Sequence, residues 1–233
     1  MFTLYLCYNI DMTKQHYHHG NLKEELIRIA FEFIAKEDVE KLTLKILAEA
    51  TGTSRSAIYK HFKNKDALIE TLIERGFDIF DEKVSPYFKT NTLPLIDQFY
   101  LTGKLYVEFA RKNPNLYRLL FGKKYAHIRE EILSIKEEDC SGFGALKKAV
   151  ERGQKEGILK KEKSYELAIV IWASMHGISS LIIDGFLDVE EIYEEVYDTL
   201  FETLLVGIVS NKIKIFSALP GLSKRLQPHK TKV

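Results

Sequence analysis

The sequence predicts an all-α protein in which a three-helix helix-turn-helix domain precedes a larger helical domain. Apolar residues recur at helical spacing along most of the chain, and no segment shows the sustained alternation of a β-strand. Near the N-terminus only Gly52 and Thr53 separate two short helical patterns, and a glycine that can adopt positive φ suits the steep crossing of a helix-turn-helix. Apolar residues make up 45% of the 233 residues and charged residues 29%, as in an ordinary globular protein.

The first helix is expected to begin at Asn21, because Asn21 and Glu24 have the spacing of a capping box. It runs to about Lys36, and its apolar residues recur at intervals of three and four, which places them on one face. These residues are Leu22, Leu26, Ile29, Ala30, Phe33 and Ile34. Residues 1–19 are interpreted as an N-terminal extension or arm, and residues 1–11 as dispensable, since Met12 would make an ordinary start.

The helix-turn-helix motif is predicted at residues 43–62. Its first helix runs from Leu44 to Thr51 with Thr43 as the N-cap, and its second helix runs from Arg55 to Phe62 with Ser54 as the N-cap. The apolar face of the preceding helix needs partners, and these two short helices supply them.

The rest of the chain is predicted to be helical up to residue 210. A helix capped by Asn64 and running from Lys65 to about Val84 completes the helix-turn-helix domain, which we place at residues 20–81. A second domain at residues 86–210 contains the further helices, expected at Pro94–Lys112, Pro114–Phe121, around Ile128–Glu156, Tyr165–Phe186 and Val189–Val209. Residues 211–233 lack an amphipathic period and are interpreted as a mobile tail.

The second helix of the motif has the chemistry of a recognition helix. Ile58 and Phe62 are spaced to point inward, which leaves polar and basic side chains facing out. Arginine and lysine can donate to guanine in the major groove, and hydroxyl groups suit bases or phosphates. The predicted DNA-binding residues are Thr43, Lys45, Ser54, Arg55, Ser56, Tyr59, Lys60, His61 and Lys65, of which Thr43, Lys45, Tyr59, His61 and Lys65 are expected to contact phosphates.

Local charge supports this interpretation, although a solvated basic face is the alternative. The formal net charge of the chain is only +1. The segment from Thr43 to Lys65, however, contains several lysine and arginine residues and a single acidic residue, Glu49. The segment from Asp184 to Glu202 contains acidic residues and no lysine or arginine. DNA affinity is therefore expected from this basic segment rather than from the molecule as a whole.

Aromatic residues of the second domain are candidates for a ligand pocket. The predicted lining consists of Phe99, Tyr106, Phe109, Tyr117, Phe143, Trp172 and His176. Aromatic residues at helical spacing more often belong to a packed core than to a ligand pocket. The sequence therefore favours Trp172 as part of the domain or dimer core and His176 as a hydrogen-bonded histidine in the core. The longest apolar stretch, Leu167 to Ile183, is interrupted by polar residues and is interpreted as a buried helix rather than a membrane span.

The run from Asn21 to Leu68 resembles the DNA-binding domain of the tetracycline-repressor (TetR) family. The residues that carry the resemblance are Tyr59, His61, Phe62, Lys65 and Leu68, which fall on a Y-x-H-F-x-x-K-x-x-L signature. The sequence departs from the family at Thr53, where valine is common, and at Thr51, where alanine usually precedes the glycine. Trp172, His176 and Gly177 resemble a Trp-His-Gly signature in the C-terminal domain of some members.

The resemblance implies a homodimer that pairs its last two long helices and holds a ligand cavity among the middle helices. It implies a double-stranded DNA operator and an unidentified small-molecule effector as partners, with repression as the commoner mode over activation. The ligand, the operator sequence and the regulated genes are not specified by the sequence.

Other sites and functions are disfavoured by the sequence. Cys7 and Cys140 are far apart and belong to no ligand cluster, so neither a disulfide nor a zinc site is indicated, and a cytoplasmic location fits best. His16, His18 and His19 lack acidic companions and suit a phosphate-contacting arm better than a metal site, so no metal and no cofactor are expected. The sequence disfavours an enzyme, because it contains no nucleophile elbow or phosphate loop. A non-specific, nucleoid-type DNA-binding protein without an inducer remains the alternative function.

Overall fold

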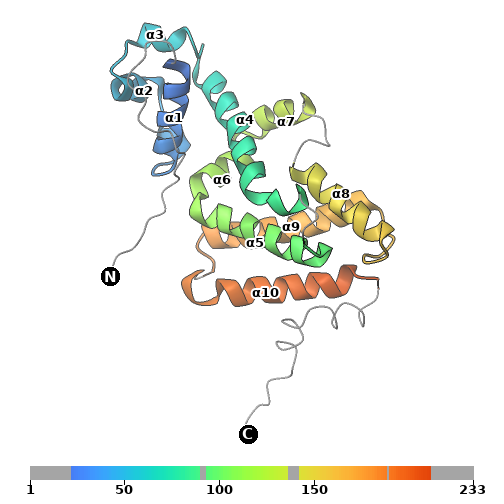
Figure 1. Ribbon diagram of the computed structural model, residues 1–233. Helices are drawn as coiled ribbons and strands as arrows, with labels where there is room; N and C mark the ends of the chain where they lie inside the picture. The colour runs from blue at the N-terminus through green and yellow to red at the C-terminus, as the bar shows by residue number, and fades with distance from the viewer. Residues whose placement is uncertain (1–21, 90–92, 136–141, 188, 211–233) are drawn as a thin grey trace. The chain divides into compact units, whose positions relative to one another are not determined.

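The computed structural model describes residues 22–89, 93–135, 142–187 and 189–210, and all secondary structure among them is helical apart from one isolated β-bridge, Leu159 with Val209 (Figure 1). The predicted N-terminal arm, the C-terminal tail, Asn21, both cysteines and the histidines at 16, 18 and 19 lie outside the described residues. The chain divides into two compact units, one ending at Ile69 and the other beginning at Glu70. The division falls within the long helix α4 (Lys65–Val84), which both units share.

The first unit is built from three short helices around a small apolar core. It contains α1 (Leu22–Ile34), the 3-10 turn η1 (Val39–Lys41), α2 (Leu44–Thr51) and α3 (Arg55–Tyr59). The predicted helical face of α1 is buried, and residues of α1, α2, α3 and α4 that are fully enclosed meet in the core: Leu26, Ala30, Leu47, Ile58, Leu68 and Ile69.

Two helix ends differ from the sequence-based prediction. Helix α1 ends at Ile34 rather than near Lys36, and α3 ends at Tyr59 rather than at Phe62. Beyond Tyr59 the backbone N–H of Lys60 bonds to the carbonyl of Ile58, which tightens the last turn and ends the regular helix.

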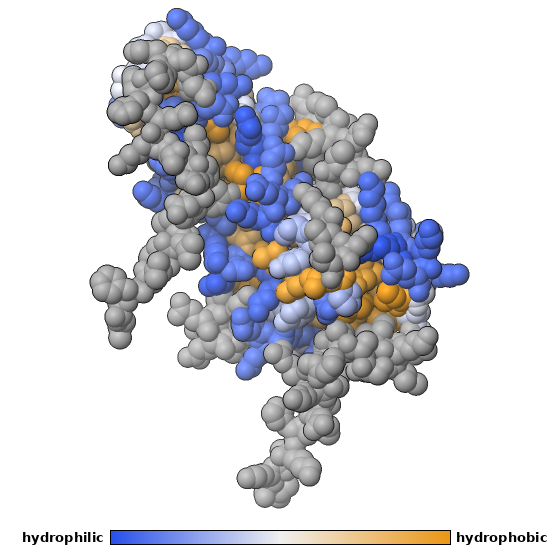
Figure 2. Space-filling view, viewed as in Figure 1, coloured by the Kyte–Doolittle hydropathy of each residue, from blue (hydrophilic) through white to orange (hydrophobic). Residues whose placement is uncertain are grey.

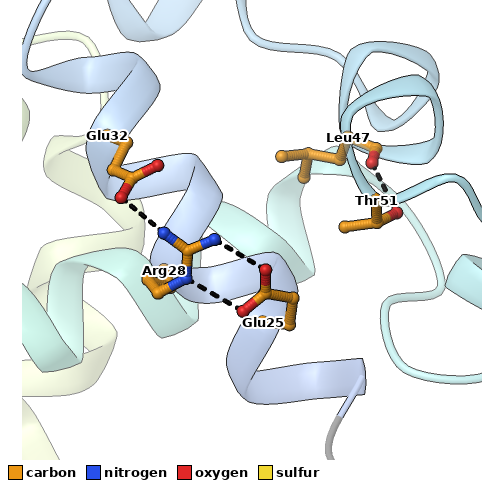
Figure 3. A network of polar contacts seen from close by, with 5 residues as sticks. All are labelled: Glu25, Arg28, Glu32, Leu47 and Thr51. Carbon is orange, nitrogen blue, oxygen red and sulfur yellow. Dashed lines mark hydrogen bonds and ion pairs between the residues drawn. The ribbon is translucent and has the colours of Figure 1, made fainter. Parts of the chain in front are cut away.

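The outer side of α1 carries an ion-pair network instead of apolar residues. The Arg28 guanidinium lies between two carboxylates, 2.6 Å from Glu25 and 2.5 Å from Glu32 (Figure 3). The hydrogen bond from Arg28 lowers the pKa of Glu25. Because all three side chains are partly exposed, the network stabilises the helix only modestly.

The second unit packs its helices around α5 (Leu95–Lys112). The other elements are the C-terminal part of α4, the 3-10 turn η2 (Pro86–Lys89), α6 (Pro114–Phe121), α7 (Ala126–Ile135), α8 (Gly142–Lys155), α9 (Ser164–Ile183) and α10 (Val189–Ile208). Helix α5 packs against α6, α9 and η2, and α8 also lies against α9. The stretch expected to be helical around 128–156 is divided between α7 and α8, and Pro114 occupies the first turn of α6 as predicted.

Candidate nucleic-acid interface and ligand cavity

Local capping positions the motif helices of the first unit. The Thr43 hydroxyl accepts a hydrogen bond from the backbone N–H of Ile46 at 3.2 Å, and the Ser54 hydroxyl accepts one from the N–H of Ala57 at 3.2 Å. Between the two helices Gly52 has a φ of 63°, the left-handed conformation that the turn requires. The caps and the turn therefore fix where α3 begins and in which direction it leaves α2.

The orientation of α3 agrees with the sequence-based prediction. Ile58 is 0% exposed and Phe62 is 2% exposed, whereas Tyr59 is 56% exposed. The two apolar residues hold the helix on the core, so its opposite side faces solvent. The predicted contact residues Thr43, Lys45, Ser54, Arg55, Ser56, Tyr59, Lys60 and His61 are all exposed on this unit.

Lys65 has an intramolecular role in addition to any contact with DNA. Its ammonium donates to the carbonyls of Val39 at 3.1 Å and Glu40 at 2.8 Å, and this ties the first turn of α4 to η1. Lys45 is less constrained, because its ion pair with Glu49 spans 3.7 Å between two exposed side chains. Such a surface pair is weak and leaves the ammonium able to contact phosphate.

The second unit contains a cavity of about 480 Å³ within the volume range of small-molecule sites. Its wall is strongly apolar and draws on α4, η2, α5, α6, α7, α8, α9 and α10. Four of the seven residues predicted to line a pocket do so: Phe99, Tyr106, Phe143 and Trp172. Phe109, Tyr117 and His176 do not reach the cavity.

The sequence-based prediction missed much of the cavity wall. Aromatic or large apolar residues outside the predicted set line it: Phe77, Phe80, Phe88, Tyr165, Ile169, Met175, Phe201 and Leu205. Several of them lie on α4 and α10, helices that the sequence associated with DNA binding and dimer formation. Their apolar positions at helical spacing were visible, but whether such a position faces a cavity or a filled core depends on tertiary packing.

A chain of hydrogen bonds leads from the cavity wall into the core behind it. The Trp172 indole N–H donates to the Tyr106 hydroxyl at 3.1 Å, the Tyr106 and Tyr117 hydroxyls are 3.0 Å apart, and Tyr117 lies 2.6 Å from Nδ1 of His176. Indole can only donate, so a consistent direction has Tyr106 donating to Tyr117 and Tyr117 donating to an unprotonated Nδ1. This direction places the His176 proton on Nε2.

Burial sets the protonation of this chain. It raises the pKa of Tyr106 to about 12 and also raises that of Tyr117. Burial lowers the pKa of His176, and the positive charge of Arg129 lowers it further. The chain is therefore neutral near pH 7, and His176 is hydrogen-bonded as the sequence favoured, although it is half-buried rather than enclosed in the core.

One side of α9 is apolar and exposed. By length and composition alone this helix could cross a membrane, yet it packs on α5, α8 and α10 along its other side. The expected buried helix is thus buried on one side only, since Val170 is 50% exposed and Leu181 is 46% exposed. Gly177 lies between these two residues, and the space beside it is open, because a Cβ added to Gly177 would have no atom within 4 Å. Apolar side chains also reach the surface in the region of α5 (Figure 2).

Together, a capped helix-turn-helix and a helical domain with an apolar cavity define a DNA-binding transcription regulator. Residues 26–72 match the model of bacterial regulatory proteins of the tetR family, and residues 100–205 match the tetracyclin repressor-like C-terminal domain. The two models together match more than half of the chain, which belongs to the TetR family of transcription regulators. Members of this family are generally non-enzymatic, and neither match singles out the Trp-His-Gly signature.

Individual proteins are similar to this chain in sequence or in fold. The nucleoid occlusion factor SlmA of Vibrio cholerae is 29% identical over 103 residues, which are 44% of this chain and 52% of SlmA, so the chain spans about half the length of that curated relative. A protein of unknown function from Rhodococcus sp. RHA1 has a similar structure, with 25% identity, a TM-score of 0.69, and coverage of 85% of this chain and 100% of its own. A TetR-family transcriptional regulator from Haemophilus influenzae shares the fold at 22% identity and a TM-score of 0.59, covering 81% and 96%.

Proposed function

We propose that this protein is a sequence-specific repressor that binds an inverted-repeat operator as a homodimer and is controlled by a small ligand in the cavity of the second unit. The observation that carries the proposal is the solvent-facing side of α3, where Arg55, Ser56, Tyr59 and Lys60 are exposed. Buried Ile58 anchors the helix behind them, so the polar side chains can enter a major groove without disturbing the core.

The exposed side of α9 supports the homodimer. Val170, Ala173, Gly177 and Leu181 recur at intervals of three and four, so they share one face, and all are exposed. A second copy of the same helix would cover this face, and the absence of a side chain at Gly177 would allow the two helices to approach closely. Helix α10 offers small exposed residues to the same kind of contact: Thr199, Thr203 and Gly207.

The ligand and the operator are coupled through α4 in this proposal. Phe77, Phe80 and Val84 of α4 line the cavity, and the same helix begins in the first unit. At Gly76 it lies so close to α6 that an added Cβ would stand 2.8 Å from Leu120. A ligand that shifts α4 would change the spacing of the two recognition helices, which must match half-sites about 34–36 Å apart. Such a coupling is typically worth about 1–3 kcal/mol.

A nucleoid-type function is the second candidate, because SlmA is among the curated relatives. In that case the protein would bind DNA without an effector. The apolar cavity favours the ligand-controlled regulator, since a protein without an effector has no need to leave about 480 Å³ unfilled between its helices.

Selection of random double-stranded DNA on the purified protein tests the proposal. The winning sequence is then titrated at two salt concentrations. Enrichment of an inverted repeat with two half-sites is the expected result. Binding that enriches no sequence and simply weakens with salt would contradict sequence-specific regulation and favour the nucleoid-type function.

A further inference from the structure

Arg129 places a positive charge in the wall of the apolar cavity. It lies on α7, and one of its guanidinium nitrogens, Nη1, donates to the carbonyls of Leu120 at 3.0 Å and Gly122 at 2.9 Å, at the end of α6. These two bonds fix the plane of the guanidinium. Neither Nε nor Nη2 has a partner within the part of the chain that the structure describes.

Several other polar groups of the cavity are engaged or enclosed. Tyr106 receives a hydrogen bond from Trp172 and shares one with Tyr117. Asp81 takes part in a further polar interaction. The Thr102 hydroxyl oxygen is buried and has no hydrogen-bond partner among the described residues. Among the described residues that line the cavity, Arg129 is the cation, and its Nε and Nη2 groups have N–H donors to offer.

An anion is the natural partner of such a group. A guanidinium stays charged at all physiological pH values and presents paired N–H donors that match the two oxygens of a carboxylate. In an apolar cavity the attraction between opposite charges is stronger than in water. The lowered pKa of His176, to which Arg129 contributes, is consistent with an uncompensated positive charge at this place.

Building on the proposed function, we infer that the effector is an apolar carboxylate, with its hydrocarbon or aryl body among the aromatic rings and its carboxylate on Arg129. The cavity sets the size of this body. At about 30 Å³ for each water-sized group, 480 Å³ holds roughly 15 non-hydrogen atoms. Phe80, Phe121 and Trp172 supply a wall for the body, and Arg129 selects the charge of the head group.

A set of probes with one tail and three head groups tests the inference. Dodecanoate, 1-dodecanol and dodecylamine are titrated by calorimetry, below their micelle concentrations, into the full-length protein and into Arg129→Met. Lys123→Met is the matched control, because Lys123 is an exposed cation in the loop that precedes α7 and does not line the cavity. Arg129→Lys is the second variant, which keeps the charge if loss of the bonds to α6 unfolds Arg129→Met.

We expect dodecanoate to bind about ten- to a hundredfold more tightly than 1-dodecanol, which is the range of a charge-assisted hydrogen bond. Arg129→Met should remove this preference and leave the affinity for 1-dodecanol unchanged, while Arg129→Lys should keep part of the preference and Lys123→Met all of it. Equal binding of acid and alcohol, tightest binding of the amine, or no binding of any probe would overturn the inference.

Measuring the operator affinity of the same protein samples, with and without dodecanoate, distinguishes a failure of this inference from a failure of the proposed function. If dodecanoate binds through Arg129 and changes operator affinity, both stand. If it binds through Arg129 and leaves operator affinity unchanged, the ligand class stands and the control of DNA binding fails. If it does not bind while the operator is still recognised, the ligand class fails and sequence-specific DNA binding stands.

Discussion

The two candidate sites of this protein are built in opposite ways. The predicted DNA-contacting surface comes from one continuous stretch, residues 43–65, and most of its side chains point outward from short helices held by local caps. The cavity collects side chains from Phe77 to Ile208, which meet only when seven helices and a 3-10 turn have packed. A convex contact surface can thus be specified locally, whereas a cavity is a property of the whole domain.

This difference determines what substitutions reveal. An exposed residue on α3 contributes little to its own unit, so removing it reports on DNA contact alone. Phe121, in contrast, lines the cavity and also contacts the rings of Phe80, Tyr117 and His176. Changing such a residue alters ligand contact and core packing together.

The largest effect is expected from removing two side chains of α3. Arg55→Ala and Tyr59→Ala should each cost about 1–3 kcal/mol of specific binding, because each removes an outward donor, and the double variant should lose about a hundredfold or more in operator affinity. Fluorescence anisotropy with the selected operator measures the loss, and the melting temperature should stay unchanged. Lys36→Ala, which removes an exposed cation outside the motif, is the control. Unchanged affinity in both single variants would mean that α3 is not the recognition helix.

A smaller effect is expected inside the second unit from Tyr117→Phe. The substitution removes the hydroxyl that joins Tyr106 to His176 and leaves Nδ1 of His176 with only its longer contact, 3.5 Å, to the Tyr106 hydroxyl. Losing a buried hydrogen bond should lower the free energy of unfolding by about 1–3 kcal/mol. Denaturant unfolding measures it, with Tyr87→Phe, a tyrosine outside this hydrogen-bond chain, as the control. The affinity of the ligand-free protein for the operator should be unaffected. A large loss of operator affinity would show that a substitution in the second unit also changes the DNA-contacting surface.

The same contrast explains what the sequence could predict. The caps at Thr43 and Ser54, the positive φ of Gly52 and the inward direction of Ile58 follow from spacing within a few residues, and all four are present. For the cavity, spacing identified Phe99 and Tyr106 but also Phe109 and Tyr117, which face neighbouring helices instead. Arg129 gave no sequence signal at all, because a single arginine on an amphipathic helix becomes notable only when packing turns it toward an apolar wall.

Acidic pH provides a milder perturbation of the second unit. The pKa of His176 is lowered in the folded protein, so the unfolded chain binds the additional proton first as the pH falls. The contribution of His176 to stability is therefore complete above about pH 6.5, the ordinary histidine pKa, and declines as the pH falls from there toward the lower folded value. Melting temperatures between pH 8 and pH 5 should fall more for the wild type than for His176→Asn, whose side chain does not titrate. Parallel curves would contradict a neutral, buried His176.

The smallest effect is expected from Lys45→Ala, which tests whether a residue of the first unit contacts DNA phosphates or reads bases. Lys45 is exposed on α2, outside α3, and its only described ion pair, with Glu49, is long. If Lys45 contacts phosphate, Lys45→Ala should weaken binding to operator and to unrelated DNA by the same factor and reduce the slope of log affinity against log salt by about 1. Arg55→Ala, measured in parallel, should instead weaken operator binding more than binding to unrelated DNA. A Lys45→Ala variant that loses preference for the operator would place Lys45 among the base-reading residues, so sequence recognition would extend beyond α3 to α2.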